Sequence, residues 1–481
     1  MAKKYLCLFL SLFLLTTVCG CKKNTADEYS STEVEVIYEV EESSQEQTAA
    51  SSQESSSSNN STVKKPQKVT SSSSSTEQPV ASSAPSTPTT VPDPNPTGKN
   101  SRPYLGSATV ADGRIDVNDG HLYFSPYNWY NGGSYRLNTV CGGYLKVAFT
   151  GSYLAIGVDD SNIGSNGRAS FEIHGYIDGV GGKDTPIVRT LDNASGGRIV
   201  FADNLSGGTH YATIYLSHTG EGDAWYNGAQ NSLRINGVYI NPGEQVVDLA
   251  DTSNKVKPRR VIFYGDSITE AVGTSGAEYG YVAQLAMEMD AEYGQLGNGG
   301  MGWALGGARA LDSFYIIDSK AGYWRYYFEG ASRLVNDDIN AGFIDGEPDA
   351  VFVNMGTNDA FANKNGGGMD SSFIKTVCAG WLPSIRAAVG SNTDIYFTVP
   401  FDYGKSASLE KRFKNALLDA VDEYKSASGD NNLHVLDLDK EGYRIVKNFS
   451  TDDIHPDNSG ASQLGRKLYD LLKVVKAASK H

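Results

Sequence analysis

Three short polar motifs, far apart along the chain, carry side chains suited to nucleophilic catalysis. Ser267 stands in Gly-Asp-Ser-Ile-Thr, Asn358 in Gly-Thr-Asn-Asp, and His455 in Thr-Asp-Asp-Ile-His-Pro. A serine in a sharp turn exposes its hydroxyl, an imidazole can take the proton, and a carboxamide can donate to an oxyanion. Asp452, three residues before the imidazole, can reach back to its other ring nitrogen. Each motif alone is also explained as a helix cap, a turn or a surface loop.

A glycine-rich run at 297–302 follows an expected strand near Tyr293. Because glycine lacks a Cβ atom, backbone N–H groups in such a run can approach a ligand closely. The run therefore offers further hydrogen-bond donors to a site formed by the three motifs.

Each motif is expected where a buried strand ends. Short apolar runs alternate with helical segments from about residue 257 onward, which indicates an α/β layer with a doubly wound parallel sheet. Reactive groups in such sheets gather at the carboxyl ends of the strands, and His455 stands just before the last expected helix. The expected strands are 261–264, 350–354, 394–399 and 433–438, and the expected helices are 279–289, 371–389, 409–425 and 459–478.

Residues 103–250 show the alternation of polar and apolar positions that is typical of antiparallel sheets. This pattern predicts an all-β sandwich or jelly roll in front of the α/β domain. Its aromatic residues either stack on sugar rings or pack the sheets, and packing is the commoner role of such residues; they are Trp129, Tyr130, Trp225 and Tyr226. The expected strands are 144–150, 154–158, 169–174, 187–190, 198–202, 210–215 and 233–240.

The N-terminal segments have the composition of an export signal and a tether. Two lysines precede an apolar run at 5–18, which is shorter than the roughly 20 residues that span a bilayer, so residues 1–20 are expected to be a secretory signal. The stretch 21–102 is rich in Ser, Thr and Pro and too poor in apolar residues to fold alone. It is expected to be a disordered tether.

Charge and cysteine usage exclude several classes of function. The 481-residue chain has 41 Lys and Arg against 56 Asp and Glu, a formal net charge of -15, so nucleic acid is not expected as the main ligand. No His or Cys pairs have metal-ligand spacing, and no metal site is predicted. Cys141 and Cys378 are not expected to pair.

The end of the apolar run, Val-Cys-Gly-Cys at 18–21, resembles the lipobox of bacterial lipoproteins. The resemblance implies that Cys21 becomes the lipidated first residue of the mature protein. The chain would then be held at the extracellular face of the bacterial membrane by its lipid anchor alone. Secretion with a free cysteine is the alternative.

The order and placement of the catalytic motifs resemble the SGNH (GDSL) hydrolases, whose blocks supply Ser, Gly, Asn and His. The resemblance covers residues 257–481 and implies a serine esterase that needs no cofactor. Ser267 matches the nucleophile, His455 the general base and Asp452 the carboxylate that orients it. The Ser267 N–H, the Gly302 N–H and the side chain of Asn358 match the oxyanion hole.

Some of these assignments have rivals. Gly300 is the alternative to Gly302, because Gly297 stands where the family commonly has Asn. Asp453 is the alternative to Asp452, and a backbone carbonyl could take the place of either. Asp266 is expected to stabilise the turn rather than to react.

A sandwich directly before the hydrolase domain further resembles carbohydrate esterase family 2. This resemblance implies an acetylxylan esterase-like enzyme that removes O-acetyl groups from plant polysaccharides such as xylan or mannan. The aromatic-rich stretch 303–328 either walls a sugar subsite or packs on the sheet. The alternatives are an esterase on the bacterium's own cell-wall polymer, a lipase-like acyl esterase, and a non-catalytic glycan-binding lipoprotein.

Overall fold

The computed structural model describes residues 98–161, 171–219, 232–297, 299–300, 302–303, 347–361, 370–401, 407–438, 452 and 454–478. The chain divides into two units, Met1–Thr87 and Pro88–His481, and all described residues lie in the second. The export signal, Cys21 and most of the expected tether therefore lie outside the described residues. Among the described helices, none has both the length and the apolar composition needed to cross a membrane.

The folded part begins earlier than the expected boundary at residue 102. The Lys99 ammonium donates to Glu347 at 3.1 Å, and the Asn100 N–H donates to the Pro258 carbonyl at 2.9 Å. The last residues of the expected tether are therefore attached to the α/β domain.

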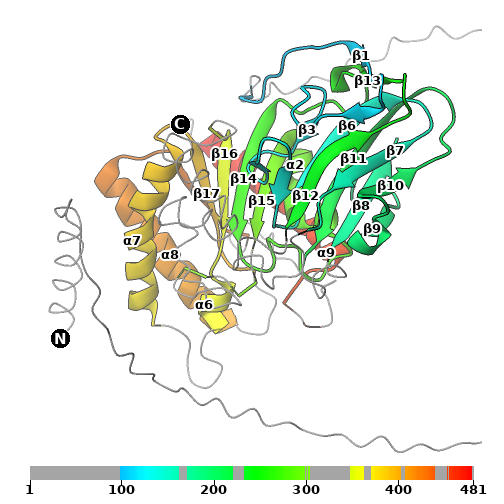
Figure 1. Cartoon of the computed structure of the whole chain (residues 1–481). Coiled ribbons are helices and arrows are strands. Elements are labelled where there is room, and N and C mark those ends of the chain that lie inside the picture. The colour runs from blue at the N-terminus through cyan, green and yellow to red at the C-terminus, as the bar shows by residue number, and fades with distance from the viewer. Residues whose placement is uncertain are drawn as a thin grey trace, which may run out of the picture. The chain divides into compact units, whose positions relative to one another are not determined.

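A five-stranded parallel sheet forms the centre of the α/β domain (Figure 1). Its strand order, β15-β14-β16-β17-β18, places the first strand in sequence next to the centre, which confirms the predicted doubly wound parallel arrangement. The strands are β14 (Arg259–Gly265), β15 (Ala291–Gly297), β16 (Ala350–Asn354), β17 (Asp394–Thr398) and β18 (Leu433–Leu436).

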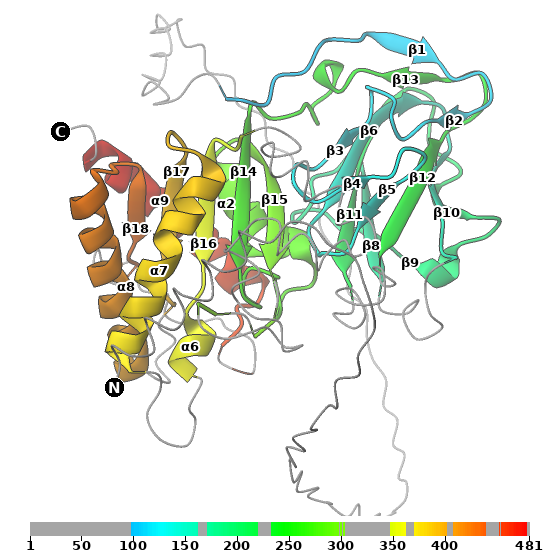
Figure 2. The same cartoon turned by 60° about the vertical axis from the view of Figure 1, so that its left-hand side comes forward.

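Helices cover both faces of this sheet (Figures 1 and 2). Ile262 and Tyr264 of β14 pack with α7 and α8, whereas Val261 and Phe263 pack with α2 and α9. The alternation follows from the period of two along a strand, and both sets are apolar because both faces are buried. The helices are α2 (Tyr281–Glu288), α6 (Thr357–Phe361), α7 (Ser371–Val389), α8 (Ala407–Ser428) and α9 (Asn458–Ala478), with the 3₁₀ helix η4 (Ala277–Tyr279) before α2.

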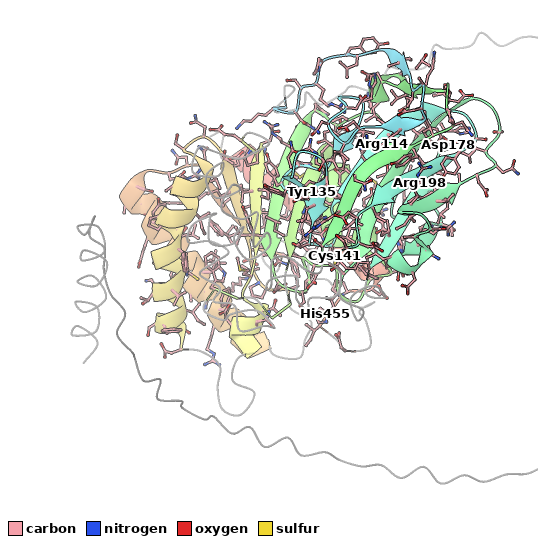
Figure 3. All side chains as sticks on the ribbon, in the orientation of Figure 1. Arg114, Tyr135, Cys141, Asp178, Arg198 and His455 are labelled. Carbon is pink, nitrogen blue, oxygen red and sulfur yellow. The ribbon has the colours of Figure 1, made fainter. Side chains whose placement is uncertain are left out.

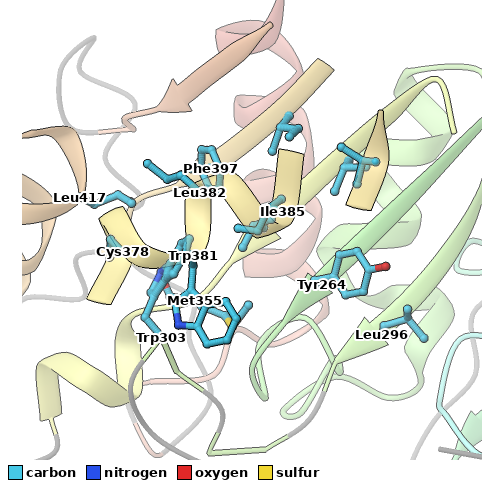
Figure 4. Close-up of a cluster of buried hydrophobic side chains, with 14 of the residues drawn as sticks. Tyr264, Leu296, Trp303, Met355, Cys378, Trp381, Leu382, Ile385, Phe397 and Leu417 are labelled. Carbon is cyan, nitrogen blue, oxygen red and sulfur yellow. The ribbon is translucent and has the colours of Figure 1, made fainter. Parts of the chain in front are cut away.

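The core beneath α7 contains the free Cys378 (Figure 4). This residue and Leu382 of α7 belong to the same buried cluster as Phe397 of β17. Cys141, in the N-terminal region, is also buried, and neither cysteine forms a disulfide within the described part of the chain.

Two antiparallel sheets form the N-terminal region, which we call the sandwich (residues 98–256). One has the order β1-β13-β6-β11-β8-β9 with β3 beside β6, and the other has β10-β7-β12-β5-β4 with β2 beside β12. A single apolar cluster contains residues of both sheets, such as Phe149 and Ile156. The predicted antiparallel sheets are therefore confirmed, and the jelly-roll order stays a prediction.

The strands of the sandwich are short at its N-terminal end and longer in its centre. The first sheet contains β1 (Ser107–Thr109), β3 (Tyr123–Phe124), β6 (Tyr144–Thr150), β8 (Glu172–Ile177), β9 (Ile187–Thr190), β11 (Thr209–His218) and β13 (Gln245–Val247). The second contains β2 (Arg114–Ile115), β4 (Tyr130–Asn131), β5 (Arg136–Asn138), β7 (Leu154–Val158), β10 (Arg198–Ala202) and β12 (Leu233–Tyr239). The 3₁₀ helix η2 (Leu191–Asn193) connects β9 to β10, and the 3₁₀ helix η3 (Leu249–Asp251) follows β13 on the way to β14 of the parallel sheet.

Of the four aromatic candidates for sugar stacking, Trp129 and Tyr130 are described, and both are packed in the protein interior. Trp129 is buried, its ring meets Phe124 edge-on at 5.1 Å between centroids, and its indole N–H donates to Ser125 Oγ at 3.1 Å. Tyr130 is buried in a core cluster. Trp225 and Tyr226, the other two candidates, lie outside the described residues.

The sandwich is joined to the parallel sheet by buried polar contacts along β15, which is an edge strand. The side-chain amide of Asn128 donates to the Gln295 carbonyl at 3.0 Å and accepts from the Gln295 N–H at 3.2 Å. Glu292, at the start of β15, accepts hydrogen bonds from the hydroxyl of Tyr144 and from the ammonium of Lys146 at 2.6 Å. The two domains therefore meet in a buried interface along β15.

Candidate active site

A continuous chain of hydrogen bonds joins three of the predicted site residues. The Ser267 hydroxyl lies 2.7 Å from His455 Nε2, and His455 Nδ1 lies 2.5 Å from Asp452 Oδ2. Because a carboxylate can only accept, it keeps the proton on Nδ1 and leaves Nε2 free to accept from the hydroxyl. This is the arrangement of a nucleophile, a base and the group that orients the base.

The backbone of the His455 loop folds around the carboxylate. Asp452 Oδ1 accepts from the N–H groups of Ile454 at 2.9 Å and His455 at 3.0 Å. The same side chain therefore holds the loop and the imidazole, while 48% of its own surface stays exposed. The rival residue, Asp453, lies outside the described residues.

Ser267 follows the end of β14, but the expected strand-to-helix turn is different in detail. Residues 266–273 form successive turns, and the next α-helix begins only at Tyr281. The Val272 N–H donates to the Ser267 carbonyl at 3.0 Å, so the chain curls back below the nucleophile. Ala271 takes a positive φ of 74°, a conformation that few non-glycine residues adopt. The sharp exposed turn is present, and no helix begins at the serine.

Asp266 stabilises this turn, as predicted. Its Oδ1 accepts from the Ile268 N–H at 3.0 Å, and its side chain is fully buried. Burial raises the pKa of Asp266 to about 7, and the nearby charge of Asp359 adds to the effect. Its second oxygen has no hydrogen-bond partner among the described residues.

Asn358 lies half-buried in α6, directly after the carboxyl end of β16. The strands β14 and β16 are neighbours, with Gly265 opposite Asn354. The motifs that follow these strands therefore meet at the carboxyl ends of the sheet. Figure 3 labels His455 below these strand ends. At these ends, Asn354 donates to Thr269 Oγ1 at 3.3 Å and accepts from Thr398 Oγ1 at 2.7 Å, which ties three strand ends together.

Gly302 is brought to the same region by a carboxylate, Asp359, for which the sequence motifs predicted no role of its own. Asp359, which follows Asn358 in α6, is buried and accepts from the Trp303 N–H at 2.7 Å. A Cβ atom on Gly302 would lie 2.4 Å from Asp359 Oδ2, so this position has no room for a side chain. The indole of Trp303 donates to the Met355 carbonyl at 3.3 Å. The fallback candidate, Gly300, has a positive φ of 75°.

The chain carries a domain of the GDSL-like lipase/acylhydrolase family, which matches residues 263–462. This span contains Ser267, Gly302, Asn358, Asp452 and His455. It identifies the protein as a carboxylic ester hydrolase, the class of enzyme that the sequence motifs predicted.

Solved carbohydrate esterases have a similar fold. A family two carbohydrate esterase from Cellvibrio japonicus is 16% identical, with a TM-score of 0.55, over 77% of this chain and 99% of that one. A family two carbohydrate esterase from Clostridium thermocellum in complex with cellohexaose is 15% identical, with a TM-score of 0.55, over 74% and 99%. An acetyl xylan esterase from the rumen bacterium Butyrivibrio proteoclasticus is 16% identical, with a TM-score of 0.54, over 79% and 100%. These shares exceed the family domain, so the likeness includes the sandwich. No curated protein matches the chain.

Proposed function

We propose that the protein is a serine esterase that removes O-acetyl groups from polysaccharide of the xylan or mannan type. The observation that carries the proposal is the hydrogen-bonded chain from Asp452 through His455 to Ser267 within a GDSL acylhydrolase domain. The reaction is acyl transfer through a covalent acetyl-enzyme.

In the first step Ser267 Oγ attacks the ester carbonyl carbon while His455 Nε2 takes the hydroxyl proton. The carbonyl oxygen becomes an oxyanion, which the N–H groups of Ser267 and Gly302 and the side chain of Asn358 stabilise. The bond to the sugar oxygen then breaks, and the leaving alkoxide takes the proton from His455. Water, deprotonated by His455, attacks the acetyl-enzyme. The bond to Ser267 Oγ breaks, Oγ takes the proton back from His455, and acetate is released.

Asp452 has a positioning role in this scheme. Its carboxylate fixes the tautomer of His455 and stabilises the imidazolium that forms in each step. Its hydrogen bonds to the loop backbone also limit movement of the imidazole away from Ser267.

The substrate is proposed from likeness to known enzymes. The similar structures include an acetyl xylan esterase and a carbohydrate esterase in complex with cellohexaose. The aromatic stretch that could wall a sugar subsite lies mostly outside the described residues, apart from Trp303, which is buried in the core.

Acetate release from acetylated xylan, acetylated mannan and acetylated peptidoglycan tests both the reaction and the substrate. We expect release from xylan or mannan, background rates for Ser267→Ala, and a loss of about 10²–10³-fold in kcat for Asn358→Ala. Release from peptidoglycan alone would favour an enzyme of the bacterium's own wall. Equal turnover by the wild type and Ser267→Ala would refute the esterase mechanism, and glycan binding without any turnover would favour a binding protein.

We further propose that residues 1–20 direct export and that a lipid on Cys21 holds the enzyme at the outer face of the cell membrane. The residues between Cys21 and the folded part, which begins near residue 98, would be the tether. The support is the lipobox-like sequence and the short apolar run before it. In cells, Cys21→Ser should release the enzyme from the membrane fraction into the medium. Retention of this variant in membranes would contradict the anchor.

A further inference from the structure

A fully buried carboxylate with no part in the proposed reaction lies between the two domains. Glu278, in η4 of the α/β domain, is bound by side chains of the sandwich. Its Oε1 lies 2.5 Å from His174 Nδ1 and accepts from the Tyr176 hydroxyl at 2.7 Å, and its Oε2 accepts from Ser217 Oγ at 2.9 Å. A buried charge is costly unless it is paired in this way.

His174 is itself held between two carboxylates. Its Nε2 lies 2.5 Å from Glu172 Oε1, so both ring nitrogens face an acceptor. Burial opposes a charge on the imidazole, but the hydrogen bonds that its ring nitrogens make to the carboxylates of Glu278 and Glu172 outweigh burial and raise the pKa of His174. Burial also opposes the charge of Glu278, and the hydrogen bond of His174 outweighs it and lowers the pKa of that carboxyl. Both shifts favour an ion pair in which His174 carries the proton and Glu278 the negative charge.

The segment that leads from the nucleophile turn to Glu278 also contacts the loop of the catalytic histidine. A Cβ atom built on Gly273 would lie 2.9 Å from His455 Cβ, so the backbone of Gly273 packs directly against that residue. The Ser275 N–H donates to Asn458 Oδ1 at 2.8 Å, and the Asn458 amide donates to Ser275 Oγ at 3.0 Å. Asn458 is the first residue of α9, which follows the His455 loop.

Residues 271–278 are thus attached at one end to the sandwich and packed at the other against His455. We infer that His174, Tyr176 and Ser217 of the sandwich are positioning residues for His455, and that they act through Glu278 and this segment. The inference rests on the proposed function. It gives the sandwich a part in catalysis that does not depend on sugar binding.

The expected effect follows from the distance dependence of catalysis. A displacement of about 1 Å at a catalytic group can cost about 10²-fold in rate. Loosening the segment should therefore lower kcat about 10- to 100-fold. KM should stay unchanged, because the positioning cluster does not face substrate.

Glu292 provides a matched control. It is also a buried carboxylate bound by the sandwich, through Tyr144 and Lys146, and it accepts from the Lys257 N–H at 2.9 Å. It lies opposite Arg260 near the start of the parallel strands, at the end of the sheet away from Ser267. Glu292→Gln should weaken the junction between the domains without moving His455.

The experiment compares Glu278→Gln with Glu292→Gln in the full chain. Four quantities are measured: the melting temperature, kcat and KM on a small acetyl ester, and the rate at which a fluorophosphonate labels Ser267. Labelling reports the activation of the serine by His455 and needs no knowledge of the natural substrate. We expect both variants to melt earlier, and only Glu278→Gln to lose kcat and labelling rate in parallel. Tyr176→Phe and Ser217→Ala, which each remove one donor, should show smaller losses in both quantities.

Equal kcat and labelling rates for the two Gln variants at equal folded fraction would show that the cluster around Glu278 only stabilises the fold. If Glu278→Gln does not fold, the donor variants decide, and unchanged labelling in both of them would overturn the inference. Failure of the wild type to release acetate from any polysaccharide would instead refute the proposed function. The labelling comparison would still be valid in that case.

Discussion

The buried carboxyl of Asp266 makes the stability of the protein depend on pH in a defined direction. The folded chain holds the proton of this group up to a pH of about 7, because burial raises its pKa from the ordinary 3.8. The unfolded chain releases the proton near the ordinary value. The contribution of Asp266 to the free energy of unfolding is therefore fully present at acidic pH, is lost as the pH rises to about 7, and changes no further above that.

The size of the effect follows from the two pKa values. The difference corresponds to about 4 kcal/mol, since each pH unit contributes about 1.4 kcal/mol. Asp266→Asn removes the titration and keeps the oxygen that accepts from the Ile268 N–H. The free energy of unfolding of the variant minus that of the wild type should rise by about 4 kcal/mol between pH 4 and pH 8.

Urea unfolding of both proteins at pH 4, 5, 6, 7 and 8 measures this difference, in which groups common to both proteins cancel. Asp203→Asn, at an exposed position of the sandwich, reports the effect of the same substitution on the surface. A difference that stays flat over this pH range, or one that turns against the variant as pH rises, would refute the assignment of a protonated carboxyl at Asp266.

Further predictions concern the candidate site and the junction between the domains. Asp452→Ala should lower kcat about 10- to 100-fold in steady-state assays. This loss is smaller than the roughly 10⁴-fold expected for a buried partner, because water can reach His455. An unchanged kcat would contradict an orienting role of Asp452. Gly273→Ala should lower kcat about tenfold and the free energy of unfolding by about 1–3 kcal/mol. The reasons are that residue 273 has a φ of 93° and that the new Cβ atom would contact His455. Wild-type values in both assays would exclude the close packing. Lys146→Met should reduce the free energy of unfolding in urea by about 3–5 kcal/mol, because it leaves the buried charge of Glu292 without its ion-pair partner. Adding Glu292→Leu should restore most of this loss. Equal losses in the single and double variants would argue against the ion pair.

The buried elements could be predicted from the sequence because burial leaves a strong pattern. The strand Ala350–Asn354 and the helix Ser371–Val389 have the predicted bounds, although Pro383 lies inside the helix. Central strands of the sandwich, such as Tyr144–Thr150, also agree. The short strands at its N-terminal end were not predicted, because two or three residues are too few to show a period. For the same reason α6, with five residues, has no counterpart among the expected helices.

The reacting groups of the site could be predicted from the sequence, but the residues that hold them in place could not. Ser267 and His455 stand in recognisable motifs at strand ends, and the structure brings them within hydrogen-bond distance. Asp359 was visible in the sequence, but nothing in the motif shows that its carboxylate binds the Trp303 N–H. No local sequence pattern marks the roles of Glu278 and His174, because their burial arises only when the two domains pack together.

The two hydrogen bonds that Asn128 makes to the backbone of Gln295 have a consequence for the behaviour of the chain in solution. An exposed edge strand is a template on which a second molecule can add a strand, and proteins protect such edges. Here the carboxamide of Asn128 binds the backbone N–H and carbonyl of Gln295, as a neighbouring strand would. A fragment that starts at the α/β domain would expose this edge strand to other copies of itself. Removing the sandwich should therefore cause self-association rather than simple unfolding.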